Sequence, residues 1–133
     1  KKYINKLKSF CKNKNIDNVK FFGFIDINSR KILSSFDLFL SLTTNYEGFG
    51  LSIAESMSVK TPVIATRVGA VNEVLDKKTG TLIPPENKSH LIASLKKFVS
   101  HRKIYEKKTD FALKKVVKIF NNDLMAKKYM KLI

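Results

Sequence analysis

Near the middle of this chain lies the stretch Glu47-Gly48-Phe49-Gly50-Leu51-Ser52-Ile53-Ala54-Glu55, which joins a glycine turn to the start of a helix. The apolar run Asp37-Leu38-Phe39-Leu40-Ser41-Leu42 comes just before it and predicts a strand. A helix start carries free backbone N–H groups and the positive end of the helix dipole, and glycine lets a ligand come close to the main chain. The order strand, glycine turn, helix therefore predicts a site for an anionic ligand.

Two carboxylates flank this turn. Glu47 and Glu55 would repel a phosphate, so we expect them to bind hydroxyl groups. A ligand that combines phosphates with many hydroxyl groups is a nucleotide sugar, and the stretch predicts this class of ligand. A structural alternative stays open for Glu55, because Ser52 and Glu55 also fit a capping box in which Ser52 is the N-cap.

Strands and helices are expected to alternate along the chain. An amphipathic helix opens it, carrying Tyr3, Ile4, Leu7, Phe10 and Cys11 on one face. The strands are expected over residues 19–24, 38–42, 61–66 and 80–83, and the helices between them over residues 29–36, 50–58 and about 71–75. The pattern predicts an α/β protein with a Rossmann-like parallel sheet flanked by helices. Loops that follow such strands share one sheet edge, so the Gly23, Glu47 and Arg67 loops should meet there.

Helices are expected to fill the C-terminal part, from about residue 87 to residue 133. Ser29 is a fair N-cap for the earlier helix over 29–36, and Asn121, Asn122 or Asp123 should start the last helix. The apolar stripes of the two helices in between are Leu91, Leu95, Phe98 and Val99, and then Leu113, Val116, Val117 and Phe120.

The composition is strongly basic, with a formal net charge of +15 over 133 residues. Nucleic-acid binding, attraction to an anionic membrane and a biased composition would each explain this charge. Only Arg30, Arg67 and Arg102 are arginine, and base readout favours arginine, so nucleic acid is the least favoured partner. Solvated lysine faces and docking of lysine-rich helices to anionic lipid both stay open.

Location is predicted from what the sequence lacks. No apolar run approaches the roughly 18 residues of a membrane span, and no signal peptide is visible. Cys11 is the single cysteine, which excludes an internal disulfide and fits a reducing cytosol. We therefore expect a cytoplasmic protein, with docking at the inner face of the membrane as the open alternative.

Several stretches occur in an order that resembles a known family. They are Asn18–Ile25, Asp37–Leu42, Glu47–Leu51 with Ala54–Met57, and Pro62–Thr66 with Val68–Ala70 and Glu73. In this order they resemble the C-terminal, donor-binding domain of retaining glycosyltransferases of family 4, which have the GT-B architecture. The resemblance is strong over about residues 15–85 and weaker over the flanking helices.

The resemblance implies transfer of a sugar from a UDP- or GDP-sugar to an acceptor such as a cell-surface polysaccharide, a lipid or a glycoconjugate, with retained anomeric configuration. Glu47 would take the catalytic position by binding hydroxyl groups of the donor sugar, and Glu55 would bind the ribose hydroxyls. The backbone of Gly48, Phe49, Gly50 and Leu51 would lie against the sugar and the diphosphate. Phe49 could equally be a core residue.

The base of the donor would be contacted by the loop after Gly23, with the backbone of Ile25 and the side chain of Arg30 as candidates. No metal and no cofactor are implied, because positive groups and helix-end dipoles would meet the charge of the leaving diphosphate.

This sequence also departs from the family. Family members carry an N-terminal acceptor-binding domain, and two further strands with a diphosphate-gripping Arg and Lys, which residues 1–133 do not contain. We therefore expect a single, incomplete nucleotide-sugar-binding domain that is truncated at its N-terminal side and inactive alone. A non-catalytic nucleotide-binding module is the first alternative, and a basic nucleic-acid-binding protein is the second.

Overall fold

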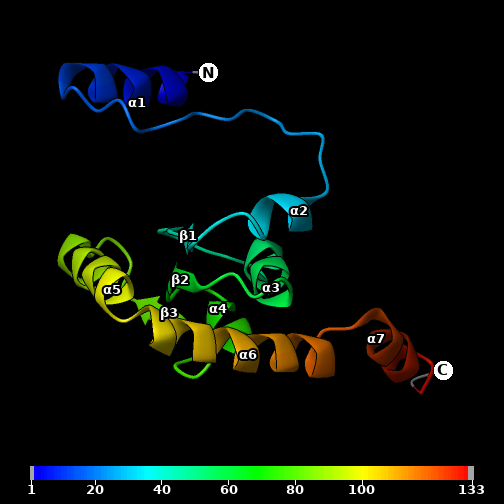
Figure 1. Ribbon diagram of the computed structural model, residues 1–133. Helices are drawn as coiled ribbons and strands as arrows, with labels where there is room; N and C mark the ends of the chain where they lie inside the picture. Colours follow the sequence, from blue (N-terminus) through cyan, green and yellow to red (C-terminus); the bar gives the residue numbers. More distant parts are fainter. Residues whose placement is uncertain (1, 132–133) are drawn as a thin grey trace.

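The computed structural model describes residues 2–131, in which helices and strands alternate (Figure 1). The elements are α1 (Lys2–Asn13), α2 (Ser29–Leu33), β1 (Phe39–Ser41), α3 (Leu51–Ser58), β2 (Val63–Thr66), α4 (Val71–Val74), β3 (Thr81–Ile83), α5 (Lys88–Ser100), α6 (Arg102–Ile119) and α7 (Asn122–Tyr129). The α/β class expected from the sequence is therefore confirmed.

The sheet has three parallel strands in the order β1-β2-β3. Leu40 pairs with Ile64, and Ile64 pairs with Thr81, so β2 is the central strand. All residues of β2 are buried, as expected for a strand with a partner on each side and helices on both faces.

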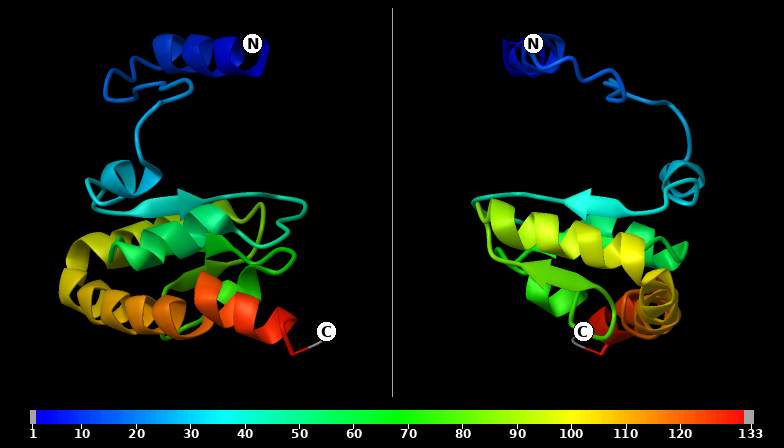
Figure 2. Two further views of the ribbon diagram at one scale, coloured as in Figure 1. Left: turned by 90° about the vertical axis from the view of Figure 1, so that its right-hand side faces the viewer. Right: turned by 60° about the vertical axis from the view of Figure 1, so that its left-hand side comes forward.

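The core lies mainly on one face of this sheet. Helices α3 and α6 pack together there, and α5 covers the opposite face near β3 (Figure 2). The core cluster joins side chains of α3, β2, α4 and α6, namely Ile53, Ala54, Met57, Val63, Ala65, Val68, Val71, Val74, Leu75, Ala112 and Val116. This cluster fixes α3, and with it the position of the glycine turn that precedes the helix.

Two lysines tie α6 to the loop between α4 and β3. The ammonium of Lys115 lies 2.8 Å from the Asp76 carboxylate, and Lys108 Nζ donates to the carbonyl oxygen of Gly80 at 2.6 Å. Partial burial lowers the pKa of Lys108 most, and the nearby charge of Lys97 lowers it further. These contacts hold α6 along the sheet beside the core.

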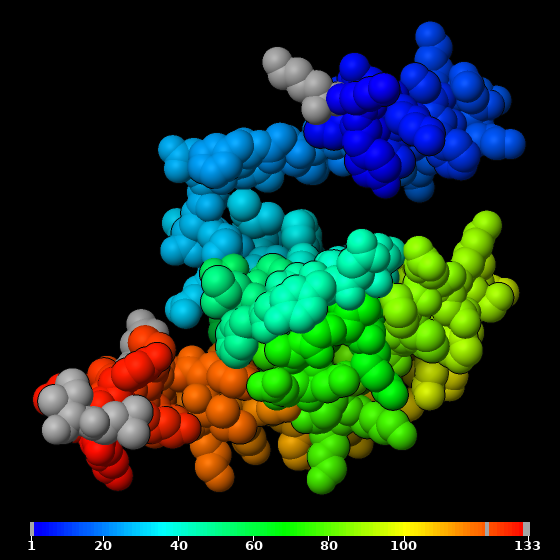
Figure 3. All heavy atoms as spheres, turned by 180° about the vertical axis from the view of Figure 1, so that it is seen from behind, coloured from blue at the N-terminus to red at the C-terminus, as the bar shows by residue number. Residues whose placement is uncertain are grey.

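The strand predicted over residues 19–24 is wrong, because these residues run extended without a partner strand. β1 is the edge strand of the sheet on that side. Phe22 and Phe24 are 72% and 95% exposed, and α1 has no buried residue. The space-filling view shows α1, in dark blue, standing apart from the body of the molecule (Figure 3). Residues 19–24 include β-branched and aromatic side chains that favour a strand, but a strand also needs a neighbour to pair with.

Several details of the helices differ from the predictions. Asn28 rather than Ser29 caps α2, because its Oδ1 accepts a hydrogen bond from the N–H of Arg30, and α2 ends at Leu33 rather than Phe36. Asn121, one of the expected alternatives, caps α7. Val99 and Val117 are exposed, so they do not belong to the packed stripes of α5 and α6. The packed stripe of α6 is instead Tyr105, Thr109, Ala112 and Val116.

Candidate functional site

The candidate site is the start of α3 together with the loop of residues 42–50 that leads into it. Gly50 is the N-cap, in the left-handed conformation with φ 77° and ψ 54°, and no side chain caps the helix. The N–H groups of Ile53 and Ala54 both donate to the carbonyl oxygen of Gly50. The N–H groups of Leu51 and Ser52 precede these first helical bonds, so they are the groups that a ligand could use.

The capping box considered for Glu55 is wrong. Ser52 is the second residue of α3 rather than its N-cap. By contrast, α2, α5 and α7 each begin after an asparagine whose side chain accepts a hydrogen bond from the helix start. Helices α4 and α6 also lack such a side-chain bond, but their N-caps are not glycine. Glu55 is therefore free of a capping role on α3.

Glu47 is held from two directions. Its Oε1 accepts a hydrogen bond of 3.2 Å from the N–H of Gly50, which places the half-buried carboxylate at the helix start. Its carbonyl oxygen accepts a hydrogen bond of 3.0 Å from the N–H of Ala70, in the turn that follows β2. The side chain is thus positioned jointly by the loops after β1 and β2.

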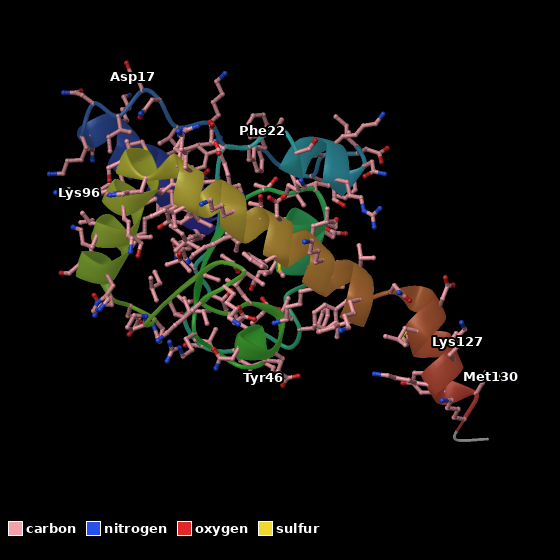
Figure 4. All side chains as sticks on the ribbon, turned by 60° about the horizontal axis from the view of Figure 1, so that its bottom comes forward. Asp17, Phe22, Tyr46, Lys96, Lys127 and Met130 are labelled. Atoms are coloured by element: carbon pink, nitrogen blue, oxygen red, sulfur yellow. The ribbon has the colours of Figure 1, made fainter. Side chains whose placement is uncertain are left out.

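Thr66 ties the same loop to the end of β2. Its buried hydroxyl donates to the carbonyl oxygen of Thr43 at 2.5 Å and lies 3.4 Å from that of Ser41. Tyr46 lies farther along the loop, where its side chain points outward (Figure 4). The inner part of the loop is therefore fixed to the sheet, and its outer part faces solvent.

The structure keeps the other residues of the stretch together around the helix start. Gly48 and Leu51 are exposed and Gly50 is buried. Glu55 is half-buried on α3, whose buried side chains are Ile53, Ala54, Ser56 and Met57. The individual roles expected for these residues toward a donor stay predictions.

Phe49 is neither a core residue nor fully solvated. Its ring makes an edge-to-face contact with Phe120, with centroids 5.2 Å apart. Phe49 and Leu51 line a hollow of about 430 Å³ between the glycine turn and α7, together with Phe120, Leu124, Met125 and Lys128. Through Phe49, the glycine turn thus contacts the C-terminal end of α6 at Phe120.

The structure does not bring the Gly23 loop to the Glu47 loop. In both views of Figure 2, α2 and the loop after β1 lie at opposite ends of that strand. Ile25 lines a hollow with side chains of α2 and the turn after it, and Arg30 is an exposed residue of α2. Gly23 is exposed, with no atom near the position of a Cβ. These residues are displaced because residues 19–24 do not join the sheet.

The Arg67 turn does meet the Glu47 loop, as expected. The Arg67 N–H donates to the carbonyl oxygen of Ile83 at 2.8 Å, while its side chain is exposed. The roles of Thr66 and Ala70 in holding the loop, and the close approach of Gly69 to Glu47, are not predicted from the sequence. A threonine at a strand end followed by a glycine turn is the only signal that could have indicated these contacts.

Two further observations concern metal ligands and membrane-spanning helices. Within residues 2–131, no group of three or more His, Cys, Asp and Glu side chains is placed to hold a metal ion. Across the same residues, no helix has both the length and the apolar character required to cross a membrane.

Comparison with known proteins gives consistent matches. A family model described as "Glycosyl transferases group 1" matches residues 1–115. A probable sucrose-phosphate synthase from Thermosipho melanesiensis is 36% identical over 98 residues, which is 70% of this chain and 21% of that protein. The chain thus spans about a fifth of the length of this curated relative.

Solved structures match the fold over nearly the whole chain. The C-terminal domain of the glycosyl transferase group 1 protein LpcC from Francisella tularensis has a TM-score of 0.78 and 27% identity, covering 91% of this chain and 64% of that one. HepE from Anabaena, solved in complex with UDP-glucose, has a TM-score of 0.88 and 22% identity, covering 98% of this chain and 37% of that one. The fold is that of the C-terminal domain of GT-B glycosyltransferases.

Proposed function

Because the chain belongs to the glycosyl transferases group 1 family, we propose that it binds the nucleotide-diphosphate sugar donor of a retaining glycosyltransferase. The observation that carries this proposal is the start of α3. No side chain caps the helix there, and the N-cap Gly50 and the Glu47 carboxylate lie in one loop. HepE, which has the same fold, was solved with UDP-glucose, a molecule of the proposed class. The donor of this chain would be a UDP- or GDP-hexose.

Each part of the donor would meet a different part of the site. The diphosphate would accept hydrogen bonds from the N–H groups of Leu51 and Ser52 at the positive end of α3. Glu47 would bind hydroxyl groups of the sugar, and Glu55 would bind the ribose hydroxyls. Gly48 and Gly50 would let the backbone approach both.

The transfer would consist of departure of the nucleoside diphosphate and attack by the acceptor hydroxyl on the same face of the sugar. The developing charge on the diphosphate would be stabilised by fixed N–H dipoles that need no reorganisation. The acceptor would be held by a separate N-terminal domain, which positions its hydroxyl for attack. The acceptor is proposed to be a surface polysaccharide, a lipid or a glycoconjugate.

The proposal is tested by titrating UDP-glucose and GDP-mannose into the chain by calorimetry, and by assaying transfer in the full enzyme. Glu47→Ala should abolish transfer while the melting temperature stays nearly unchanged, because only one partly buried hydrogen bond to Gly50 is lost. Glu106→Gln, at an exposed position of α6, is the matched control and should transfer normally. Near-normal transfer by Glu47→Ala would reject the role of Glu47.

The same measurements, together with a titration of single-stranded DNA at two salt concentrations, separate the two alternative functions. A non-catalytic module would bind the nucleotide sugar, but the full protein would transfer nothing to any acceptor. A nucleic-acid-binding protein would bind single-stranded DNA with an affinity that falls steeply between about 50 and 200 mM salt. A donor pocket should bind the nucleotide sugar with an affinity that depends little on salt, and free UDP should compete with the nucleotide sugar for the pocket.

We also propose that the outward face of α6 docks the protein on an anionic membrane surface. Four exposed lysines repeat along this face at helical spacing, with the exposed ring of Phe111 among them: Lys103, Lys107, Lys114 and Lys118. The acid beside them, Asp110, is paired with Lys60 at 2.7 Å. A cationic face with an aromatic residue at its centre is suited to lipid headgroups, and this fits a lipid-linked acceptor.

Membrane docking is tested by co-sedimentation with vesicles of phosphatidylcholine alone and of phosphatidylcholine with phosphatidylglycerol. The chain should sediment only with the anionic vesicles, and replacing the four α6 lysines by Gln should prevent this. A control that replaces Lys12, Lys20, Lys31 and Lys88 removes the same charge from other exposed positions. Equal loss in both variants would show that net charge alone is responsible.

A further inference from the structure

The turn that follows β2 packs directly against the loop that carries Glu47. We propose that Gly69 is a positioning residue for Glu47. Because Gly69 has no Cβ, the turn of residues 67–70 can close on the main chain of Glu47 and fix where the Glu47 carboxylate stands at the start of α3. Gly69 would affect the donor only through Glu47, so its role rests on the donor-binding function proposed above.

The contact leaves no room for a side chain at this position. Gly69 has φ of +51°, and a Cβ built there would overlap the carbonyl oxygen of Glu47. It would also lie 2.9 Å from the Glu47 nitrogen and 3.0 Å from its carbonyl carbon. All three atoms belong to the backbone, which cannot rotate away as the end of a flexible side chain can. Any other residue at 69 would therefore push the Glu47 main chain away from the turn.

Hydrogen bonds show that the approach is specific to the Glu47 loop. Next to Gly69, the N–H of Ala70 donates to the Glu47 carbonyl oxygen at 3.0 Å. On the other side of Glu47, its carboxylate accepts from the N–H of Gly50 at 3.2 Å. A shift of the Glu47 main chain would stretch both bonds at once, and the carboxylate would lose its fixed place over the helix start.

Packing of the core does not explain the requirement for glycine at 69, because Gly69 is an exposed residue. Gly80 provides the contrast. It is buried, and a Cβ there would overlap Cδ1 of Leu75 and lie 2.9 Å from its Cγ, so the conflict is with a core side chain. Gly80→Ala is therefore a matched control that disturbs packing without touching Glu47.

The first test measures amide hydrogen exchange in the chain without ligand. Gly69→Ala should accelerate exchange of the Gly50 and Ala70 amides several-fold, because both bond to Glu47, whereas Gly80→Ala should leave these two amides unchanged relative to the rest of the core. Gly69→Asn separates the two possible causes, since asparagine tolerates a positive φ but still carries a Cβ. It should behave like Gly69→Ala.

The second test measures binding of UDP-glucose and of UDP by calorimetry. Gly69→Ala should weaken UDP-glucose by at least about tenfold, the scale of one lost hydrogen bond to a charged group, and should weaken UDP less because UDP lacks the sugar. In a Glu47→Ala background the same substitution should cause no further loss, because the residue that it positions is already gone. Gly80→Ala should lower the melting temperature and keep the affinity.

Other results would overturn the assignment. If Gly69→Asn behaves like the wild type, backbone strain rather than contact with Glu47 explains the glycine. If Gly69→Ala and Gly80→Ala give the same pattern, or if the loss persists in the Glu47→Ala background, Gly69 is a structural residue only. If the two amides respond as expected but the wild-type chain binds neither UDP-glucose nor UDP, the positioning of Glu47 stands and the donor-binding function fails.

Discussion

Glu55 lies in the middle of α3, past the point where a side chain can cap the helix. Gly50 takes the N-cap position, and the side chains that α3 buries are its neighbours Ile53, Ala54, Ser56 and Met57. The Glu55 carboxylate is half-buried, lies one turn beyond the glycine loop, and neither caps α3 nor belongs to its buried side chains. This favours a ligand role over the capping role that the sequence left open.

Replacing Glu55 by Gln should therefore weaken the donor without weakening the protein. We expect donor affinity to fall by about 1.5–3 kcal/mol, the usual value of a hydrogen bond to a charged group. The melting temperature should stay unchanged, because no cap is lost. Calorimetry with UDP-glucose and thermal unfolding followed by circular dichroism check both parts. A lowered melting temperature with normal affinity would show that Glu55 stabilises the fold and does not bind the donor.

At the scale of elements, the pair of Asp76 and Lys115 connects the α4–β3 loop to α6. Partial burial tends to raise the pKa of Asp76, but the hydrogen bonds from Lys115 and from the N–H groups of Lys78 and Thr79 outweigh it. The net result is a pKa below the ordinary value of 3.8. A carboxylate whose pKa is lowered in the folded state stabilises that state above its ordinary pKa, and the stabilisation is lost as the pH falls through the folded-state value.

Asp76→Asn should accordingly lower the free energy of unfolding by about 1 kcal/mol at neutral pH, the upper range for a partly exposed ion pair. The difference from the wild type should shrink as the pH falls below 3.8 and the carboxylate becomes protonated. Urea unfolding at a series of pH values measures this. Asp110→Asn, which breaks the pair with Lys60, should change stability less at every pH, because solvent screens this exposed pair. A pH-independent effect of Asp76→Asn would assign the loss to the loop bonds instead.

The strands that the sequence predicted well are those that have a partner strand among the described residues. The strands over 38–42, 61–66 and 80–83 were expected and formed in shorter versions, because each has a neighbour in the sheet. Residues 19–24 have the same β-branched and aromatic character, yet no pattern within them can show whether a neighbouring strand exists. The expected meeting of Gly23, Ile25 and Arg30 with Glu47 depended on that strand, and it failed for the same reason.

In the candidate site, too, some features could be predicted from the sequence and others could not. The glycine turn and the helix start were predictable, because both follow from local residue preferences. The contacts of Gly69, Ala70 and Thr66 with the loop join residues about 20 positions apart, and no local preference encodes such a distance. The exposed Val99 and Val117 show a similar limit, since helical spacing does not define which side of a stripe meets the core.

At the scale of the whole molecule, the chain divides into a packed body and an N-terminal part that covers little of it. Among the described residues, the buried core cluster lies between Ile53 and Val116, with Phe39 and Phe120 packed against it, while α1 buries no side chain. The N-terminal part also carries the exposed side chains of Phe22 and Phe24. Exposed apolar patches commonly mark a surface that meets another protein segment.

Removing residues 1–27 should therefore leave the stability of the body almost unchanged. Asn28 is kept because it caps α2, and Leu33 of α2 is buried. We expect the free energy of unfolding to change by less than about 1 kcal/mol, the scale of one net hydrogen bond. Urea unfolding measures this, with Met57→Ala as a positive control expected to cost about 2–5 kcal/mol. A large loss on truncation would show that α1 contributes to the folded core in solution.

The glycine at the beginning of α3 has a last consequence for how this protein responds to its ligand. A good N-cap side chain stabilises a helix by roughly a few tenths of a kcal/mol more than glycine does, and α3 lacks such a side chain. A phosphate oxygen that accepts hydrogen bonds from the Leu51 and Ser52 N–H groups would supply this stabilisation. The melting temperature should therefore rise as the nucleotide fills the site. The rise in melting temperature on adding a diphosphate nucleotide would then measure how much the bound phosphate stabilises the start of α3.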